Sequence, residues 1–398
     1  MLKILLVSNL YPNKFEPTRG VFTEQIVSNL KDHHQVEVIA PVPWLPSVLT
    51  RFKHNLSSSL PNSTFYKGTK VYHPKYLVIP KYGRWLYGIL YFFGIFNTLR
   101  KVKKDFNPDV INVHWMYPDA FGAVLAARIL KIPVVTHSLG CDINEYATYP
   151  SRRFFIKKAL HWSDLNITVS DELTKKVISL GSPEQKTQTI MNGINKDLFT
   201  QQDKLSIRKE LDLPRDKTIL LFAGNFNIEK GLSILINAFA QIANKFPKSC
   251  LVVVGSGPLE KEIFDLVDAL NLRERIYFKG RVDHSEVPSF LAAADFLCLP
   301  SLREGCPNIV LEALSTGTPV LSSRVGAVPE MLKSNENNFG LLAQPNDIND
   351  FSRILDQALS TSWKFPLKFQ WMSWIESSNK IANALASVTI KEPTVPLS

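Results

Sequence analysis

The sequence predicts an α/β protein built from two doubly wound parallel sheets. The chain has 398 residues, which is more than one hydrophobic core comfortably serves, so two domains are the default expectation. Buried strand patterns alternate with helix patterns in both halves, and strands joined through helices pair in parallel. The composition is globular, with 45% hydrophobic and 21% charged residues and no tract of low complexity.

In the first half, a predicted strand at 109–114 leads through a helical pattern to another at 133–136, which makes a β-α-β unit. The loop 9–19 separates the first strand from a helical pattern that begins after Gly20. A loop in this position lies at the carboxyl edge of the sheet, where ligands bind. The predicted strands of the two halves are 3–8, 36–40, 109–114, 133–136, 165–170, and then 218–223, 250–254, 276–278, 296–299, 319–322 and 339–343.

The net charge of +10 is concentrated in the first half, where residues 1–198 hold 25 Lys and Arg against 14 Asp and Glu, while residues 199–398 hold 21 against 22. A basic half can meet nucleic acid, an anionic membrane or an acidic substrate, and no segment is typical of a nucleic-acid module. Four cysteines without paired spacing predict free thiols in a reducing compartment and disfavour a zinc site. The first apolar run is too short for a signal peptide, so we expect a cytoplasmic protein.

Residues 85–98 carry no charge and lie between basic residues. This run is too short to span a bilayer, which needs ~20 apolar residues. Two interpretations remain open: a buried helix of the first domain, or an interfacial helix whose basic flanks contact anionic headgroups. Residues 152–158 repeat the basic and apolar mixture, so peripheral binding to the inner face of the cell membrane is a hypothesis.

The segment 300–330 carries the most distinctive chemistry. A buried strand runs into a loop with Glu304, and Pro307 at the first helical position then opens a short helix that contains Glu312. The helix dipole and the first amides favour anions or polar oxygens at this end. Two carboxylates beside such amides suit a ligand with many hydroxyl groups, although either glutamate alone could be an ordinary surface residue. The amides expected to lack intrahelical acceptors are those of Asn308, Ile309 and Val310.

This segment resembles the donor-binding signature of the retaining glycosyltransferases of family 4. The matching motif is Glu-Gly-x-Pro-Asn with a second Glu, then Gly-x-Pro-Val and Gly-x-x-Pro-Glu, and the resemblance extends over nearly the whole chain. It implies the GT-B fold, in which two Rossmann-like domains face a central cleft. By this likeness Glu304 approaches the donor sugar and Glu312 the ribose. The neighbouring donor-binding positions would be Gly305, Pro307, Asn308 and Ile309.

The resemblance also assigns donor-side residues outside this segment. Lys230 lies in a glycine loop before a helix, and its ammonium group suits a diphosphate. Members of the family commonly have an arginine where this chain has Asn225, so one phosphate contact would lose its charge. A second glycine turn borders the nucleotide, and a third segment meets the base. These positions are Gly255, Gly257 and Arg281.

In the first half, Tyr-Pro…Gly-x-Phe resembles the opening of one branch of the family, where Gly20 would approach the donor phosphates. Gly140 and Asp142 match a family motif, His-Gly-x-Asp, whose histidine lies near the reacting carbon. Leu139 occupies the histidine position, and His137 lies two residues earlier. Either a shifted loop brings His137 to the site, or the role is vacant and His137 packs at a strand end. The predicted catalytic residues are Glu304, Lys230, Asp142 and His137.

The domains implied are an acceptor-side domain at 1–198, a donor-binding domain at 199–362, a closing helix at 363–386 that packs on the first domain, and a frayed tail at 387–398. The expected activity is retaining, metal-independent transfer of a sugar from a nucleoside diphosphate to a saccharide or lipid-linked acceptor, without a cofactor, in cell-envelope polysaccharide synthesis. Two alternatives remain: a silent nucleotide-sugar-binding or scaffold protein, and a GT-B epimerase or hydrolase.

Overall fold

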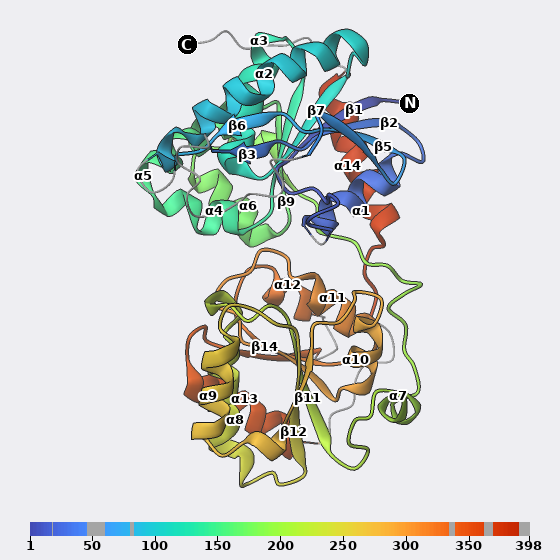
Figure 1. Cartoon of the computed structure of the whole chain (residues 1–398), viewed down its shortest axis with the longest axis vertical. Coiled ribbons are helices and arrows are strands. Elements are labelled where there is room, and N and C mark those ends of the chain that lie inside the picture. Colours follow the sequence, from blue (N-terminus) through green and yellow to red (C-terminus); the bar gives the residue numbers. More distant parts are fainter. Residues whose placement is uncertain (18, 46–59, 80–82, 334–338, 362–368, 390–398) are drawn as a thin grey trace. The chain divides into compact units, whose positions relative to one another are not determined.

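The computed structural model describes residues 1–17, 19–45, 60–79, 83–333, 339–361 and 369–389. These residues form two compact units (Figure 1). The first unit joins Met1–Gly193 to the chain's end, from Trp374 onwards, and the second is Ile194–Ser373.

The first unit is built on an eight-stranded sheet with the order β10-β9-β8-β7-β1-β2-β5-β4. Every neighbouring pair is parallel except β4 and β5, which form an antiparallel hairpin at one edge. The strand order reverses between β1 and β7, which makes this the topological switch point. The strands, including the separate β3–β6 pair, are β1 (Lys3–Val7), β2 (Gln35–Ile39), β3 (Val42–Trp44), β4 (Ser63–Tyr66), β5 (Thr69–Tyr72), β6 (Lys75–Leu77), β7 (Val110–His114), β8 (Val134–Ser138), β9 (Leu165–Thr168) and β10 (Thr187–Thr189).

Helices cover both faces of this sheet. Helices α1 and α14 share one buried cluster with residues of β1, β7, β8 and β9, whereas α3 packs with α2 and α5. The main helices are α1 (Val21–Leu30), α2 (Tyr87–Asp105), α3 (Phe121–Ile129), α4 (Cys141–Asn144), α5 (Pro150–Trp162), α6 (Asp171–Ser179) and α14 (Trp374–Thr389), with the short turns η3 (Arg84–Leu86), η4 (Met116–Ala120), η5 (Tyr146–Thr148) and η6 (Glu184–Lys186).

The second unit has a six-stranded, fully parallel sheet with the order β13-β12-β11-β14-β15-β16. This is the doubly wound order of a dinucleotide-binding sheet, and its switch point lies between β11 and β14. The elements are α7 (Lys204–Glu210), β11 (Thr218–Ala223), η7 (Ile228–Lys230), α8 (Leu232–Ala243), β12 (Ser249–Val254), α9 (Glu260–Ala269), η8 (Arg273–Arg275), β13 (Ile276–Gly280), α10 (Val287–Ala293), β14 (Phe296–Leu299), α11 (Asn308–Ser315), β15 (Val320–Ser323), α12 (Val328–Leu332), β16 (Gly340–Ala343) and α13 (Ile348–Ser360).

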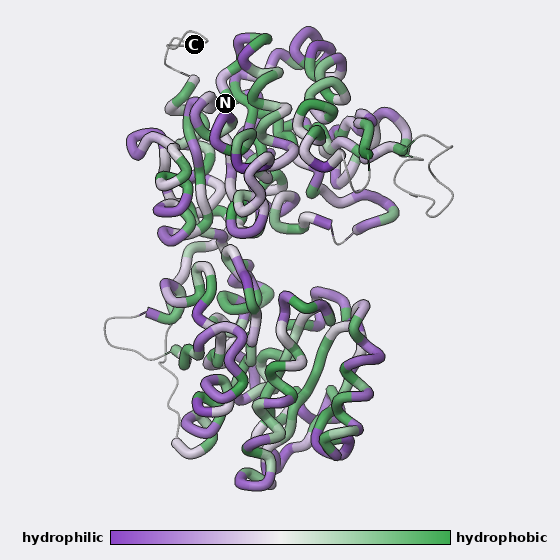
Figure 2. The backbone as a smooth tube through the Cα atoms, turned by 90° about the vertical axis from the view of Figure 1, so that its left-hand side faces the viewer, coloured by the Kyte–Doolittle hydropathy of each residue, from purple (hydrophilic) through white to green (hydrophobic). Residues whose placement is uncertain are grey.

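Two hydrophobic cores lie on the two faces of this second sheet. Helices α8, α9 and α13 contribute to one core, and α7, α10, α11 and α12 contribute to the other. Strands covered on both faces read as continuous apolar runs, and β12 and β14 are buried along their whole lengths. Figure 2 shows hydrophobic strand segments running through the middle of this unit.

The predicted α/β class with two parallel sheets is confirmed, and several boundaries differ. The units divide at Gly193 rather than at residue 198, because Ile194 pairs with Ser373 in the second unit. The closing helix begins at Trp374 rather than at 363, while residues 369–373 belong to the second unit. It continues to Thr389, so the expected fraying from 387 was wrong for its first residues, and 363–368 and 390–398 lie outside the described residues.

The uncharged run at 85–98 lies mainly in α2, which buries one face. Tyr91, Ile95 and Leu99 on this face have no exposed surface, which agrees with the buried-helix interpretation. The opposite side of the helix still exposes 68% of Phe93. Among the described residues, no helix is both long and apolar enough to cross a bilayer.

Candidate functional site

The carboxyl ends of β11 and β14 bring two predicted residues together in the second unit. The Nζ atom of Lys230, in the loop after β11, lies 2.7 Å from Oε1 of Glu304, in the loop after β14. Ser301 donates its hydroxyl to the same oxygen at 2.7 Å. Glu304 is 9% exposed, so a carboxylate and an ammonium group meet in a partly desolvated position at the switch point of the sheet.

Close backbone contacts hold these two loops together. The amide of Leu302 donates to the carbonyl of Glu229 at 2.8 Å. Gly231 has a left-handed backbone, with φ 66, and a Cβ atom there would lie 2.1 Å from the carbonyl oxygen of Pro300. The chain therefore needs glycine immediately after Lys230, because any larger residue would push the lysine loop away from Glu304.

The second glycine turn is packed against the loop that follows β11. A Cβ atom at Gly255 would lie 1.9 Å from the carbonyl oxygen of Gly224, and one at Gly257 would lie 2.6 Å from the amide of Phe226. The exposed residue Asn225 lies between Gly224 and Phe226 in the chain. The structure therefore places Asn225, Gly255 and Gly257 in one loop cluster. Arg281 is next to this cluster, because the carbonyl of the preceding residue in the chain, Gly280, accepts a hydrogen bond from the amide of Gly255 at 2.7 Å.

Helix α11 begins one residue later than predicted. Pro307 is its N-cap residue, and the helix starts at Asn308. The amide of Val310 donates to the carbonyl of Pro307 at 3.0 Å, so the expectation that it lacks an acceptor was wrong. A tight first turn supplies this bond.

Glu312 points toward a residue that the sequence did not indicate. Its Oε1 atom lies 3.2 Å from Nε2 of His284, and Glu312 itself is 9% exposed. The hydrogen bond to Glu312 raises the pKa of His284 above its usual value. His284 lies 28 residues away along the chain, so no spacing signal links it to Glu312. Ser301 lies only three residues before Glu304, within the segment 300–330, but it was not among the predicted site residues.

Asp142 in the first unit binds backbone rather than facing solvent. Its carboxylate accepts hydrogen bonds from the amides of Met116 at 3.0 Å, Leu139 at 3.1 Å and Gly140 at 2.8 Å. Burial raises its pKa to about 6, against the opposing effect of these amides. Asp142 therefore ties the loop after β7 to the loop after β8, and the described contacts give it a positioning role.

His137 lies inside strand β8, with 1% of its surface exposed. Its ring packs edge-on against His114 at a centroid distance of 4.7 Å, and neither ring nitrogen has a hydrogen-bond partner among the described residues. The shifted-loop interpretation is therefore not what the structure shows: the strand continues through His137, and the side chain is directed into the core. The packing interpretation describes its position.

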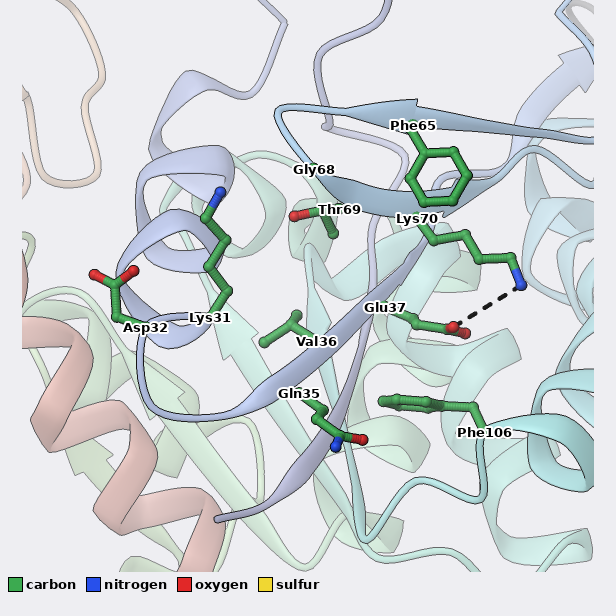
Figure 3. A pocket seen from close by; sticks show the side chains of 10 residues that line it. All are labelled: Lys31, Asp32, Gln35, Val36, Glu37, Phe65, Gly68, Thr69, Lys70 and Phe106. Carbon is green, nitrogen blue, oxygen red and sulfur yellow. Dashed lines mark ion pairs between the residues drawn. The ribbon is translucent and has the colours of Figure 1, made fainter.

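Gly20 and a surface hollow both belong to the first unit. Gly20 has φ 62, and a Cβ atom there would lie 2.2 Å from the carbonyl oxygen of Leu10, so its own loop already requires glycine. A hollow of about 660 Å³ lies at the amino end of β2, where Phe65, Lys70 and Glu37 surround it (Figure 3). Ligands of doubly wound sheets bind at the opposite, carboxyl edge, and none of the predicted site residues lines this hollow.

Gly231→Ala tests the packing of the lysine loop against a matched control. Gly280 has a similar left-handed backbone, with φ 68, but no atom lies within 4 Å of the position that a Cβ atom would take there. We expect Gly280→Ala to cost about 1–2 kcal/mol for the backbone alone, and Gly231→Ala to cost clearly more because of the collision with Pro300. Equilibrium urea unfolding measures both, and equal losses would show that the contact with Pro300 is not rigid.

The burial of His137 and the hydrogen bond between His284 and Glu312 predict different protonation of these two histidines. Burial lowers the pKa of His137 to about 4, so its ring should stay neutral from pH 7 to pH 5, whereas His284 should titrate above ~6.5. The folded state then binds fewer protons at His137 than the unfolded chain, so this residue's contribution to stability falls as pH drops from ~6.5 toward 4. Nitrogen-15 NMR of the rings, assigned with His137→Phe and His284→Phe, checks this. Protonation of His137 near its usual pKa would mean that water reaches it and would revive a catalytic role.

Comparisons with known proteins agree with this geometry. The family model "Glycosyltransferase Family 4" matches residues 20–198, and "Glycosyl transferases group 1" matches residues 203–370. A Bacillus subtilis protein described as a teichuronic acid biosynthesis glycosyltransferase, TuaC, is 28% identical over 349 residues, 86% of each chain. N-acetyl-alpha-D-glucosaminyl L-malate synthase of Bacillus anthracis is 29% identical and aligns with 77% of this chain and 78% of its own.

Among solved structures, Anabaena HepE, crystallised with UDP and glucose, superposes with a TM-score of 0.69 at 19% identity. The superposition covers 97% of this chain and 100% of HepE, and at this identity the likeness concerns the fold. The two family models adjoin near the boundary between the two units and together extend over most of the sequence. The chain belongs to the family 4 glycosyltransferases, the group 1 glycosyl transferases, and has their two-domain GT-B fold.

Proposed function

We propose that this protein transfers a sugar from a nucleoside diphosphate to an acceptor hydroxyl with retention at the anomeric carbon and without a metal ion. The observation that carries the proposal is the contact of 2.7 Å between Lys230 Nζ and Glu304 Oε1 at the switch point of the second sheet. An ammonium group offers compact charge to a diphosphate, and the start of α11 adds amides and a favourable dipole.

The donor diphosphate would take the place of Glu304 as the partner of Lys230. When Lys230 binds the diphosphate, Glu304 still accepts the hydrogen bond from the hydroxyl of Ser301. This bond keeps the carboxylate of Glu304 in place, where it would bind the donor sugar. Glu312 uses Oε1 for His284 and has its second oxygen for a ribose hydroxyl. Preorganised charges of this kind stabilise the negative charge that develops on the leaving diphosphate, which is the role a metal would otherwise have.

Retention follows if the leaving phosphate itself takes the acceptor proton on the same face of the sugar. This route needs no side chain as a base. The burial of His137 and the three backbone hydrogen bonds of Asp142 favour it, because neither group is placed to accept a proton from a substrate.

The acceptor is proposed to be a saccharide or a lipid-linked saccharide of the cell envelope. The name of TuaC refers to teichuronic acid synthesis, and the Bacillus anthracis relative is named for a malate glycoside, so the relatives' names do not agree on one acceptor. The match to TuaC over 86% of each chain favours envelope polysaccharide.

Lys230→Ala and Glu304→Ala should each lower transfer more than tenfold, which is about 1.4 kcal/mol or more of transition-state stabilisation. Lys245→Ala is the matched control, because Lys245 pairs with Asp356 at 2.5 Å and its side chain is 59% exposed. Product is measured by chromatography with UDP-, GDP- and ADP-sugars, with and without acceptor and chelator. Full activity in both site variants contradicts the site, loss of activity with chelator contradicts metal independence, and donor turnover without acceptor would indicate a hydrolase or epimerase.

We also propose weak peripheral binding to an anionic membrane through the outer side of α2. Phe93, Arg100 and Lys104 are all exposed and follow one another at helical spacing along this side. No ion pair involves either basic residue among the described parts of the chain. An apolar ring followed by basic groups suits the boundary between acyl chains and anionic headgroups.

Vesicle sedimentation at low salt tests this surface. Binding to vesicles with phosphatidylglycerol should exceed binding to phosphatidylcholine alone. Arg100→Gln with Lys104→Gln should weaken it more than tenfold, since each basic residue contributes about 1 kcal/mol near such a surface. Phe93→Ser should also weaken it, whereas Phe65→Ser, which changes a ring that is 76% exposed on β4, should not. Equal partition to both vesicle types would remove the proposal.

A further inference from the structure

An aromatic surface lies at the carboxyl edge of the first unit's sheet, just beyond the ends of β7 and β8. The ring of Trp115, the first residue after β7, meets Tyr146 edge-on at a centroid distance of 5.7 Å. The guanidinium of Arg152 lies 4.6 Å from the centroid of Tyr146 and 4.4 Å from that of Tyr149. We call these four residues, Trp115, Tyr146, Tyr149 and Arg152, the Trp115 platform. They come from two segments, Trp115 from the loop after β7 and the other three from residues 146–152, so the fold brings Trp115 to the other three.

The backbone of Trp115 is strained. Its φ of 80 and ψ of 122 lie outside the regions that a bulky residue normally adopts. A conformation of this kind costs about 1–3 kcal/mol and persists only where neighbours hold it. Here the amide of Trp115 donates to the carbonyl of His137 at 3.1 Å, and the next amide, of Met116, donates to Asp142. The buried carboxylate of Asp142 thus helps to keep the indole in place. Packing alone does not explain why a tryptophan occupies a backbone conformation that favours glycine.

The guanidinium of Arg152 adjoins this surface without a carboxylate partner. Arg152 forms no ion pair among the residues that the structure describes. Its printed contacts are the rings of Tyr146 and Tyr149. A guanidinium stacked on aromatic rings keeps its N–H edge for planar, bidentate oxyanions such as phosphate and carboxylate.

We propose that the Trp115 platform binds the acceptor, with a sugar ring on the aromatic faces and an oxyanion of the acceptor on Arg152. The assignment rests on the proposed glycosyl transfer, because only a transferase has an acceptor to hold. Aromatic faces with a few oriented polar groups are typical of small-molecule sites, and the carboxyl edge of the sheet is where ligands of this architecture bind. Trp115 and Tyr146 are half-buried, which favours a single sugar as the ligand. A lipid surface would instead contact the more exposed Phe154.

Calorimetry on the full chain tests the proposal with three probes: glucose 1-phosphate, galacturonic acid and the neutral methyl α-glucoside. We expect at least one anionic sugar to bind at least tenfold more tightly than the neutral one, and the two anionic probes distinguish phosphate from carboxylate. Arg152→Gln should abolish this preference. Lys157→Gln, the same charge change at an exposed position of α5, should leave it intact.

Trp115→Gly should weaken the binding of all three sugars at least tenfold, because it removes the indole ring. Glycine adopts the positive φ without strain, so the change should not introduce backbone strain, and near-UV circular dichroism checks that the fold is kept. A purely structural role for Trp115 predicts altered stability with unchanged binding, which would overturn the proposal.

Lys230→Ala separates this surface from the donor site. If the anionic preference is lost in Lys230→Ala and kept in Arg152→Gln, the probes bind at the donor site and the proposal is wrong. If Arg152→Gln weakens vesicle binding and leaves sugar binding unchanged, Arg152 binds lipid headgroups and the proposal is wrong. If sugar binding depends on Arg152 but the protein transfers no sugar, the result supports sugar binding by the Trp115 platform and contradicts the proposed glycosyl transfer.

Discussion

The candidate site depends on one interaction, the ion pair between Lys230 and Glu304. Its two side chains are 28% and 10% exposed, so the carboxylate is largely withdrawn from water while the ammonium group keeps some contact with it. A pair in such a position gains little net stability, because the cost of desolvation offsets much of the attraction. What the pair does is hold two opposite charges in place with Ser301, as the proposed binding of a donor diphosphate requires.

The surrounding backbone is organised to keep this pair in position. Three glycines, at 231, 255 and 326, each allow a loop to approach another backbone more closely than a side chain would permit, and Gly326 packs on the carbonyls of Glu304 and Gly305. The result is a layer of loops over the carboxyl edge of β11, β12 and β14 whose shape is determined by contacts between loops. Rigid loops on a parallel sheet provide the preorganisation that charge stabilisation in a reaction requires.

The first unit uses a different device for the same edge of its sheet. Buried carboxylates there bind backbone amides and connect loops: Asp142 joins the loops after β7 and β8, and Asp119 accepts from the amide of Asn9 at 2.6 Å and from the hydroxyl of Tyr91 at 2.7 Å. Burial raises the pKa of Asp119 to about 7. Both acids lie at a ligand-binding edge, yet their described partners are protein groups, so a carboxylate at this edge is not by itself a sign of catalysis.

The sequence by itself determined the fold class, five strands of the first unit, all six strands of the second, and the segments that carry the donor-side residues. It could do so because buried parallel strands leave long apolar runs and because a glycine-rich turn before a helix is a local signal. It did not predict β3, β4, β5, β6 and β10 of the first unit. Only the tertiary structure decided that Lys230 meets Glu304, that His284 binds Glu312, that His137 stays inside a strand, and that Trp115 joins Tyr146 and Arg152. These pairings depend on which loops share one edge of a sheet, and the distance along the chain contains no information about that.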